Sequence, residues 1–327
     1  VTVPSWRGDV EHYSDLAEEV ARFWGYNVIE PTMFKGEAVT GGYTPRQQAE
    51  NKIGQLCRAM GFSEIYTYSF ISPSAYDKIL SPPDCPFRNC VKILNPLGED
   101  TSVMRTTSLP SMLEILGRNV SFRNENVMLY EMARVYRPKG EVLPNERIIL
   151  TLGAYGDMDF FRLKGCLEAI FREMNVLDIK FVPNSDVPYY HPGRCAGVYA
   201  GEKFLGMMGQ VHPTVAENFG VGQCYTAEID FYRLVNCIAP EKSYTPLPKF
   251  PTITRDIAVV CDNTVTIAQL TDCIKAGGGA LLKGVQLFDI YTGSHIPEGK
   301  KSCAFSLEMR GDERTLTDEE ADSEVKA

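Results

Sequence analysis

The chain has 327 residues, a length that usually exceeds one hydrophobic core and therefore predicts two or three folded units. Hydrophobic residues make up 44% and charged residues 23%, the composition of an ordinary soluble globular protein, which excludes a disordered or fibrous chain. The formal net charge of −9 excludes a general nucleic-acid binder, because phosphate affinity depends on clustered Lys and Arg, so any RNA contact must be local.

No apolar run reaches the roughly 18 residues that a membrane helix needs, and the start VTVPSWRGDV lacks the features of a signal peptide. The ten cysteines are scattered singly, and neither they nor the four histidines have zinc-ligand spacing. We therefore expect reduced thiols in a cytoplasmic protein that has no membrane partner. Because the first residue is Val and already lies in an apolar alternating stretch, the chain reads as a fragment.

The first predicted element is a short helix over residues 14–23, where apolar side chains recur at helical spacing before a glycine. Asp15, Glu18 and Glu19 project from one face of it, and Asp9 precedes it. Carboxylates this close repel one another unless basic side chains or a divalent ion neutralise them, and carboxylate oxygens suit magnesium better than zinc. The spacing alone favours a simpler interpretation, a solvated helix face near the positive end of the helix dipole.

Residues 36–44 predict a flexible connection, and Pro45 opens a predicted helix that closes at Gly61. Strands and helices then alternate up to about Ile238, including the hairpin CAGVYAG and KFLGMMGQV, joined through residues 201–202. The other predicted elements of this part are the strands IYTYSFI, KILNPLG, NVMLYEMARVYRP, RIILTLGAYG and IKFVP, a helix after Leu109 and a helix over residues 159–175.

The segment APEKSYTPLPKFPTIT carries four prolines and predicts a domain boundary between about 239 and 250. After it, RDIAVVCD, VQLFDIYTG and CAFSLEMRG read as strands, while TIAQLTDCIKA and LTDEEADSEVKA read as helices. The order β-α-β-β-α fits a ferredoxin-like split βαβ fold that lacks its last strand, so the C-terminus is also expected to be truncated. The overall fold class is therefore predicted as α+β.

Several segments resemble the C-terminal part of the phenylalanyl-tRNA synthetase β subunit family. They are VTVPSWRGDVEHYSDLAEEVARFWGY, NPLGEDTSVMRTTSLPSML, LYEMARVYRP, KFPTITRDIAVV, LFDIYTG and GKKSCAFSLEMRG. The resemblance implies that residues 1–35 end a β-specific domain with an acidic metal cluster. It implies that residues 36–240 form a class II synthetase-like, non-catalytic core domain, with an antiparallel sheet and flanking helices. It also implies that residues 241–327 form the ferredoxin-fold anticodon-binding domain, truncated at its end.

The resemblance further implies a magnesium site in the front segment, associated with the interface to the α subunit. Matched position by position, its implied Mg²⁺ ligands are Asp9, Asp15, Glu18 and Glu19. In class II catalytic domains arginines hold ATP, and Arg105 and Arg134 are superficially eligible for that role. In the family, however, ATP binding and adenylate formation belong to the α subunit, so we expect no catalytic residue in this chain.

For the last domain the resemblance implies contact with the anticodon region of tRNA-Phe, where unpaired bases can be read by stacking and hydrogen bonding. Over residues 244–327, however, nine Lys and Arg stand against thirteen Asp and Glu, so composition offers RNA no general attraction. The candidate RNA contacts are Arg255, Lys300 and Lys301, although Arg255 could equally form an internal ion pair with Asp256.

The leading hypothesis is a β-subunit part of phenylalanine–tRNA ligase that supports ATP-dependent charging of tRNA-Phe when assembled with α, in the family's α2β2 heterotetramer. The main alternative is a stand-alone RNA-binding or scaffold protein that reuses these domains. A third interpretation takes the front carboxylates as the active site of a magnesium-dependent phosphoryl-transfer enzyme, but no phosphate-binding loop accompanies them. Co-purification with an α subunit separates the first two hypotheses.

Overall fold

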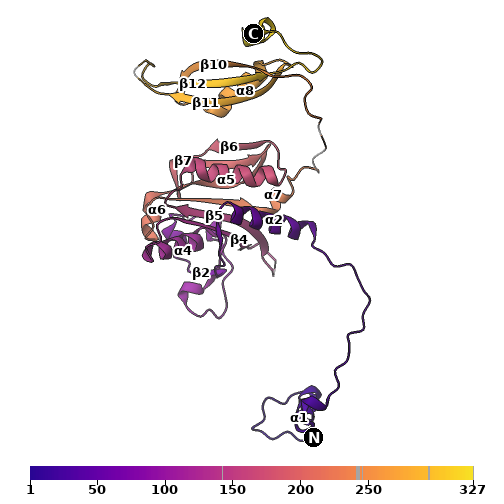
Figure 1. Ribbon diagram of the computed structural model, residues 1–327. Coiled ribbons are helices and arrows are strands. Elements are labelled where there is room, and N and C mark those ends of the chain that lie inside the picture. Colours follow the sequence, from indigo (N-terminus) through magenta and orange to yellow (C-terminus); the bar gives the residue numbers. More distant parts are fainter. Residues whose placement is uncertain (142, 241–243, 245, 294, 327) are drawn as a thin grey trace. The chain divides into compact units, whose positions relative to one another are not determined.

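The computed structural model describes residues 1–141, 143–240, 244, 246–293 and 295–326 (Figure 1). It divides into two units, Val1–Glu241 and Lys242–Ala327, each described here by itself. In the described parts of the chain, no helix combines the length and the apolar character needed to cross a membrane.

The first unit begins with helix α1 (Tyr13–Trp24), which confirms the helix predicted over residues 14–23. The helix stops at Gly25, whose φ of 99° is a backbone conformation that glycine adopts without a steric penalty. A 3-10 turn, η1 (Tyr26–Val28), follows, and residues 29–44 contain no helix or strand. No side chain of α1 is buried, so this helix contributes nothing to the hydrophobic core of the described chain.

A seven-stranded sheet, counted over the described residues, organises the rest of this unit in the order β1-β4-β5-β9-β8-β7-β6. All neighbouring strands are antiparallel except β1 and β4, which are parallel. The strands are β1 (Ser63–Glu64), β4 (Val127–Arg137), β5 (Asn145–Tyr155), β6 (Ile179–Pro183), β7 (Tyr190–Ala200), β8 (Lys203–Val211) and β9 (Cys224–Asp230). The α+β class and the antiparallel sheet with flanking helices are thus confirmed, as is the hairpin of β7 and β8.

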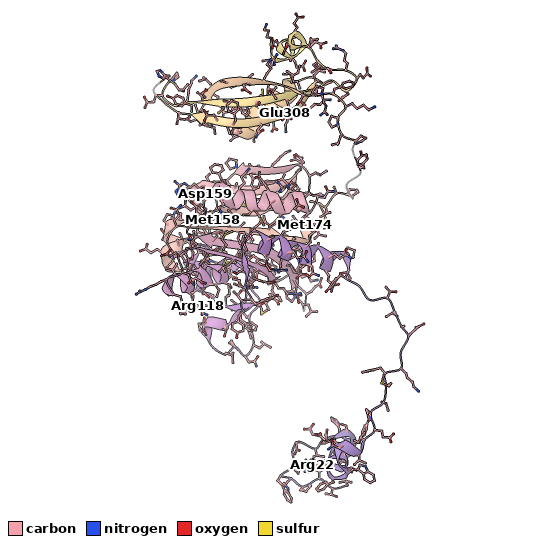
Figure 2. All side chains as sticks on the ribbon, viewed as in Figure 1. Arg22, Arg118, Met158, Asp159, Met174 and Glu308 are labelled. Carbon is pink, nitrogen blue, oxygen red and sulfur yellow. The ribbon has the colours of Figure 1, made fainter. Side chains whose placement is uncertain are left out.

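Helices α2 (Pro45–Ala59) and α5 (Phe160–Glu173) pack against one face of this sheet. Their buried side chains form one core cluster with Leu150 and Leu152 of β5. Each helix begins at a side chain that satisfies a free backbone N–H. Asp159, for example, lies at the start of α5 (Figure 2). Its carboxylate accepts a hydrogen bond of 2.7 Å from the backbone N–H of Arg162.

Helix α4 (Leu109–Ser121) packs against the opposite face of the sheet. Side chains alternate along β5 and point to the two faces in turn, so this strand contributes to the packing on both faces. Gly153 marks the closest approach of α4 to the strand. A Cβ placed there would lie 2.5 Å from the Cγ of Met112, too close for any side chain unless α4 or Met112 moved. The absence of a side chain at this position therefore lets α4 pack directly on the sheet.

Two strand predictions in the first unit are wrong. The segment KILNPLG forms only an isolated bridge between Lys92 and Val103, and IYTYSFI forms only β2 (Phe70–Ile71), which pairs with β3 (Val103–Met104). The apolar side chains of KILNPLG pack against no core, since Leu94 and Leu97 are almost completely exposed. Shorter helical elements complete the unit: α3 (Ala75–Lys78), η2 (Pro86–Arg88), η3 (Glu99–Thr101), α6 (Pro213–Asn218) and α7 (Phe231–Val235).

The second unit contains a three-stranded antiparallel sheet in the order β10-β12-β11 within the described residues. Its elements are β10 (Ile253–Asp262), α8 (Ile267–Gly277), β11 (Leu282–Tyr291), β12 (Lys300–Met309) and α9 (Asp318–Lys326). The predicted order β-α-β-β-α is confirmed. Phe305 of β12 is fully buried and packs against apolar side chains of α8, which gives this unit a core of its own.

Candidate functional sites

Two of the four front carboxylates converge on an arginine that the sequence had not singled out. The Arg7 guanidinium donates to both oxygens of Asp9, with Nε–Oδ1 and Nη2–Oδ2 distances of 3.0 and 2.8 Å. The same Nη2 also donates to Oε1 of Glu19, 2.7 Å away, and Arg22 binds the other oxygen of Glu19. These hydrogen bonds lower the pKa of Asp9, and they lower the pKa of Glu19 to about 2.

The other two carboxylates point elsewhere. The Oδ2 atom of Asp15 accepts backbone N–H bonds from His12 and Glu11 at 2.7 and 2.8 Å, and these bonds lower its pKa. This contact fixes the start of α1, as the interpretation of Asp15 as a helix-terminal carboxylate predicts. Glu18 is exposed and makes no side-chain hydrogen bond or ion pair within the described part of the chain.

Ligands of a metal ion must converge on one point, and these four carboxylates do not. In the ranges that the structure describes, no group of three or more His, Cys, Asp or Glu side chains could hold a metal ion. Arg7 instead occupies the position between Asp9 and Glu19 that a cation would take. In this arrangement arginine side chains neutralise the charge of Asp9 and Glu19, so a Mg²⁺ ion would have to displace Arg7 before it could bind both carboxylates.

The two arginines considered for ATP binding have structural contacts. Arg105 is 2% exposed, and its guanidinium donates to Glu131, to Thr67 and to the backbone carbonyl of Arg134. Arg134 itself is exposed and pairs with Glu146, with a 2.6 Å separation between Nη1 and Oε2. Each nitrogen of the Arg105 guanidinium donates a hydrogen bond inside this buried network, so burial keeps the group away from a phosphate ligand.

The candidate RNA contacts in the second unit differ in their surroundings. Arg255 on β10 donates to Asp318 and Asp322 of α9, each at 2.7 Å, so it ties this helix to the sheet. The internal ion pair considered for Arg255 therefore exists, but with α9 and not with Asp256. Lys300 and Lys301 open β12 and have only weak contacts. The Lys300 Nζ lies 3.8 Å from Asp262, and the Lys301 Nζ lies 3.2 Å from the carbonyl of Asn263.

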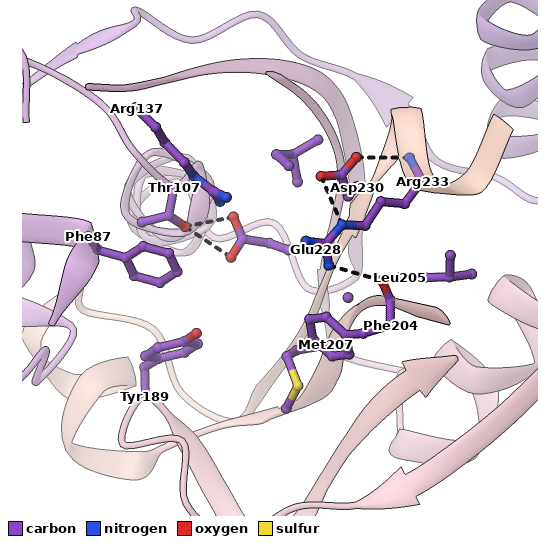
Figure 3. Close-up of a pocket in the computed structure, with 12 residues that line it drawn as sticks. Phe87, Thr107, Arg137, Tyr189, Phe204, Leu205, Met207, Glu228, Asp230 and Arg233 are labelled. Carbon is purple, nitrogen blue, oxygen red and sulfur yellow. Dashed lines mark hydrogen bonds and ion pairs between the residues drawn. The ribbon is translucent and has the colours of Figure 1, made fainter. Parts of the chain in front are cut away.

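Sequence reasoning missed Arg7, which neutralises two of the front carboxylates, and it missed one strand of the seven-stranded sheet. Arg7 stands two positions before Asp9, and that pairing of opposite charges was the available signal. Strand β9 was missed as well, although QCYTAEID alternates apolar and polar residues with the period of a strand. Its acidic side chains, Glu228 and Asp230, line a cavity on the α4 side of the sheet (Figure 3).

Comparison with known families covers nearly the whole chain. The sequence model described as "Phenylalanyl tRNA synthetase beta chain CLM domain" matches residues 29–231. Two further models match the ends: "tRNA synthetase B5 domain" over residues 1–26 and "Ferredoxin-fold anticodon binding domain" over residues 248–327.

Curated relatives agree with these matches. A protein of Clostridium tetani named phenylalanine–tRNA ligase beta subunit is 44% identical over 98% of this chain and 41% of its own length. The protein of the same name from Bacillus subtilis is 38% identical over 98% and 41%. The chain thus spans about two fifths of the length of the curated relatives it matches. Among solved structures, pyrrolysyl-tRNA synthetase from Desulfitobacterium hafniense aligns over 61% of this chain and 74% of its own, with 19% identity and a TM-score of 0.49.

Proposed function

The chain belongs to the phenylalanyl-tRNA synthetase β subunit family, and from that premise we propose that it is a non-catalytic part of a phenylalanine–tRNA ligase. In this proposal it supports the ATP-dependent attachment of phenylalanine to tRNA-Phe, while an α subunit binds ATP and carries the chemistry. The observation that carries the proposal is the likeness to ligase β subunits, which extends over 98% of the chain in the relatives from Clostridium tetani and Bacillus subtilis.

The partners in this proposal are an α subunit, in an α2β2 heterotetramer, and the anticodon region of tRNA-Phe, and the compartment is the cytoplasm. The likeness of residues 248–327 to an anticodon-binding domain supports the RNA contact. Lys300 and Lys301 are the side chains we propose for phosphate, because their ammonium groups are only weakly held. Arg255 is a weaker candidate because α9 already engages it. The division into residues 1–35, 36–240 and 241–327 stays a prediction.

An assembly experiment tests this proposal. A β subunit of the relatives' full length that contains this chain is co-expressed with a tagged α subunit, and the complex is assayed for charging of tRNA-Phe with labelled phenylalanine. We expect co-purification and charging, and we expect α alone to be inactive. Absence of co-purification would favour the alternative of a stand-alone RNA-binding or scaffold protein. Charging by α alone at the rate of the complex would contradict any role for this chain.

Magnesium binding by Asp9, Asp15, Glu18 and Glu19 is a separate proposal, supported by the match of residues 1–26 to the B5 domain. It requires that the carboxylates leave their present partners, because Arg7 holds two of them. Arg7 therefore competes with the cation in this proposal, and its removal should favour the ion.

Calorimetric titration of the complex with MgCl2 tests the magnesium proposal. The Asp15→Asn/Glu18→Gln variant should lose binding, whereas Arg7→Gln should bind magnesium more tightly than the unchanged chain. Lys35→Gln is the matched control, since it removes one positive charge from the adjacent segment without touching the four carboxylates. Equal binding by all variants would place any magnesium elsewhere.

A further inference from the structure

A cavity of about 330 Å³ lies on the α4 side of the seven-stranded sheet, outside both sites described above (Figure 3). Strands β8 and β9 form its floor, because Met207 pairs with Glu228 in the sheet register and both line the cavity. The Thr151 side chain, opposite Glu228 on β5, bonds to Ser108 at the start of α4, which places these residues on the α4 face. A volume of this size matches the lower range of small-molecule sites.

Glu228 supplies a fixed negative charge in this cavity. Its carboxylate accepts hydrogen bonds from the Thr107 hydroxyl at 2.7 and 2.9 Å, and from the backbone N–H and hydroxyl of Ser108 at 3.0 and 2.8 Å. All of these donors are neutral. Among the described residues, no basic nitrogen lies within 4.0 Å of this carboxylate, so it is held in place without a counter-charge.

Arg137 supplies a positive charge on the same cavity wall. It ends β4, and its side chain extends toward the cavity on the side where Glu228 and Thr107 lie (Figure 3). Its guanidinium carbon lies 5.9 Å from the centre of the Phe87 ring. Over the described ranges, no carboxylate comes within 4.0 Å of it. By contrast, the other acid on this wall, Asp230, is bound by Arg147 at 2.6 Å.

The third side of the cavity is apolar and aromatic. The Phe87 and Tyr189 rings lie 6.4 Å apart between their centres, and the Met207 side chain lines the cavity near them. Burial raises the pKa of the Tyr189 hydroxyl, and the nearby Glu228 charge raises it further, so this phenol stays neutral. The hydroxyl has no hydrogen-bond partner within the described chain, which leaves it available as a donor.

We propose that this cavity binds a free α-amino acid with an apolar side chain. The Arg137 guanidinium would bind the carboxylate, the free lone pairs of Glu228 would accept from the ammonium group, and Phe87, Tyr189 and Met207 would enclose the side chain. A zwitterion matches one unpaired charge of each sign. A phosphate-bearing ligand matches less well, because the unpaired carboxylate of Glu228 forms part of the cavity wall and repels it.

Isothermal titration of the 327-residue chain alone with L-leucine, L-methionine and L-phenylalanine tests the inference. We expect saturable binding of at least one of them. Phenylethylamine, which lacks the carboxylate, and N-acetyl-L-phenylalanine, which lacks the ammonium group, should each bind much more weakly than L-phenylalanine. Binding of either analogue as tightly as L-phenylalanine, or no saturable binding of the three amino acids at millimolar concentration, would overturn the proposal.

Two variants make the test specific to this cavity. Arg137→Ala removes an exposed side chain and should weaken binding at least about tenfold, because a hydrogen bond to a charged group is lost. Arg172→Ala removes the same charge from the surface of α5 and should leave binding unchanged. Met207→Trp should block the cavity, with circular dichroism confirming the fold. Unchanged affinity in Arg137→Ala would place the amino acid elsewhere. Because α is absent, this outcome is independent of tRNA charging.

Discussion

At the scale of single residues, several carboxylates of this chain are neutralised by arginine side chains or hydrogen-bonded by backbone groups. Asp9 and Glu19 share Arg7, and Asp318 and Asp322 share Arg255. Such forked contacts need an arginine, because its planar guanidinium donates several hydrogen bonds in fixed directions. Each pair reduces the repulsion that a net charge of −9 would otherwise impose on neighbouring carboxylates.

The Glu19 carboxyl offers a direct test of this pairing. Its folded pKa of about 2 lies below the usual value of about 4.3, so it stabilises the fold above pH 4.3 and loses that contribution as the pH falls toward 2. In Arg7→Gln the largest cause of the shift is removed, and the pKa should rise toward its usual value. An NMR titration of the Glu19 carboxyl measures its pKa in the unchanged chain and in Arg7→Gln, with Lys35→Gln as the control. An unchanged midpoint in Arg7→Gln would contradict the contact.

The buried pair of Arg105 and Glu131 should respond differently from a surface pair. Arg105→Met leaves the 4%-exposed Glu131 carboxylate without its counter-charge, so we expect a loss of about 3–5 kcal/mol in the free energy of unfolding. The exposed pair is the control, and Arg134→Met should cost no more than about 1 kcal/mol. Urea denaturation measures both variants.

The double variant Arg105→Met/Glu131→Leu decides whether the cost comes from the pair. It should be more stable than Arg105→Met alone, because no unpaired charge then remains buried. The single variant Glu131→Leu completes the cycle. If the loss in the double variant equalled the sum of the losses in Arg105→Met and Glu131→Leu, the two side chains would not be coupled.

At the scale of elements, the strands and helices follow local patterns, but the way they pack depends on single close contacts. The alternation along β5 sends Leu150 and Leu152 toward α5 and turns the next position, Gly153, toward α4. A glycine in a strand usually weakens it, and here the close approach of Met112 accounts for its presence.

Two Gly→Ala substitutions should therefore have opposite effects. Gly153→Ala places a Cβ 2.5 Å from Met112 and should lower the free energy of unfolding by about 1–3 kcal/mol through overpacking. Gly165→Ala, within α5, meets no atom within 4 Å and should raise it by about 0.5–1 kcal/mol, because alanine favours a helix. Denaturant titrations compare them. Stabilisation by Gly153→Ala would mean that α4 lies further from the sheet.

At the scale of the whole molecule, the second unit is acidic, yet its likeness is to an anticodon-binding domain. Over residues 244–327 the net charge is −4, so any RNA contact must use a few cations in a local arrangement. Lys300 and Lys301, adjacent at the start of β12, are the pair that the structure leaves least engaged among the three candidates.

Salt dependence provides the test of this local contact. Binding of the tRNA-Phe anticodon stem-loop to the chain is measured at several salt concentrations. Lys300→Gln/Lys301→Gln should weaken it and lower the slope of log K against log salt by about 1.5, since two phosphate contacts disappear. Lys249→Gln/Lys275→Gln removes the same charge from other exposed positions and should change the slope little. Equal slopes for the two double variants would exclude Lys300 and Lys301 as the contact.

The sequence by itself determined the features that depend on neighbours along the chain. The helix before Gly25, the hairpin of β7 and β8 and the order of elements in the second unit follow from periodicity and turn residues. The family resemblance likewise rests on contiguous motifs, because such a motif can be recognised in the sequence before it is known which segments meet in space.

Only the tertiary structure decided which distant groups meet. The partners of Asp9 and Glu19, the burial of Arg105, and the placing of Arg137 and Glu228 in one cavity depend on contacts between separated segments. The strand prediction at KILNPLG failed for the same reason, since a strand needs a neighbouring strand as well as apolar residues. Hydrogen bonds and charges act over a few ångströms in space, and sequence spacing reports such proximity only within a helix turn, a strand or a hairpin.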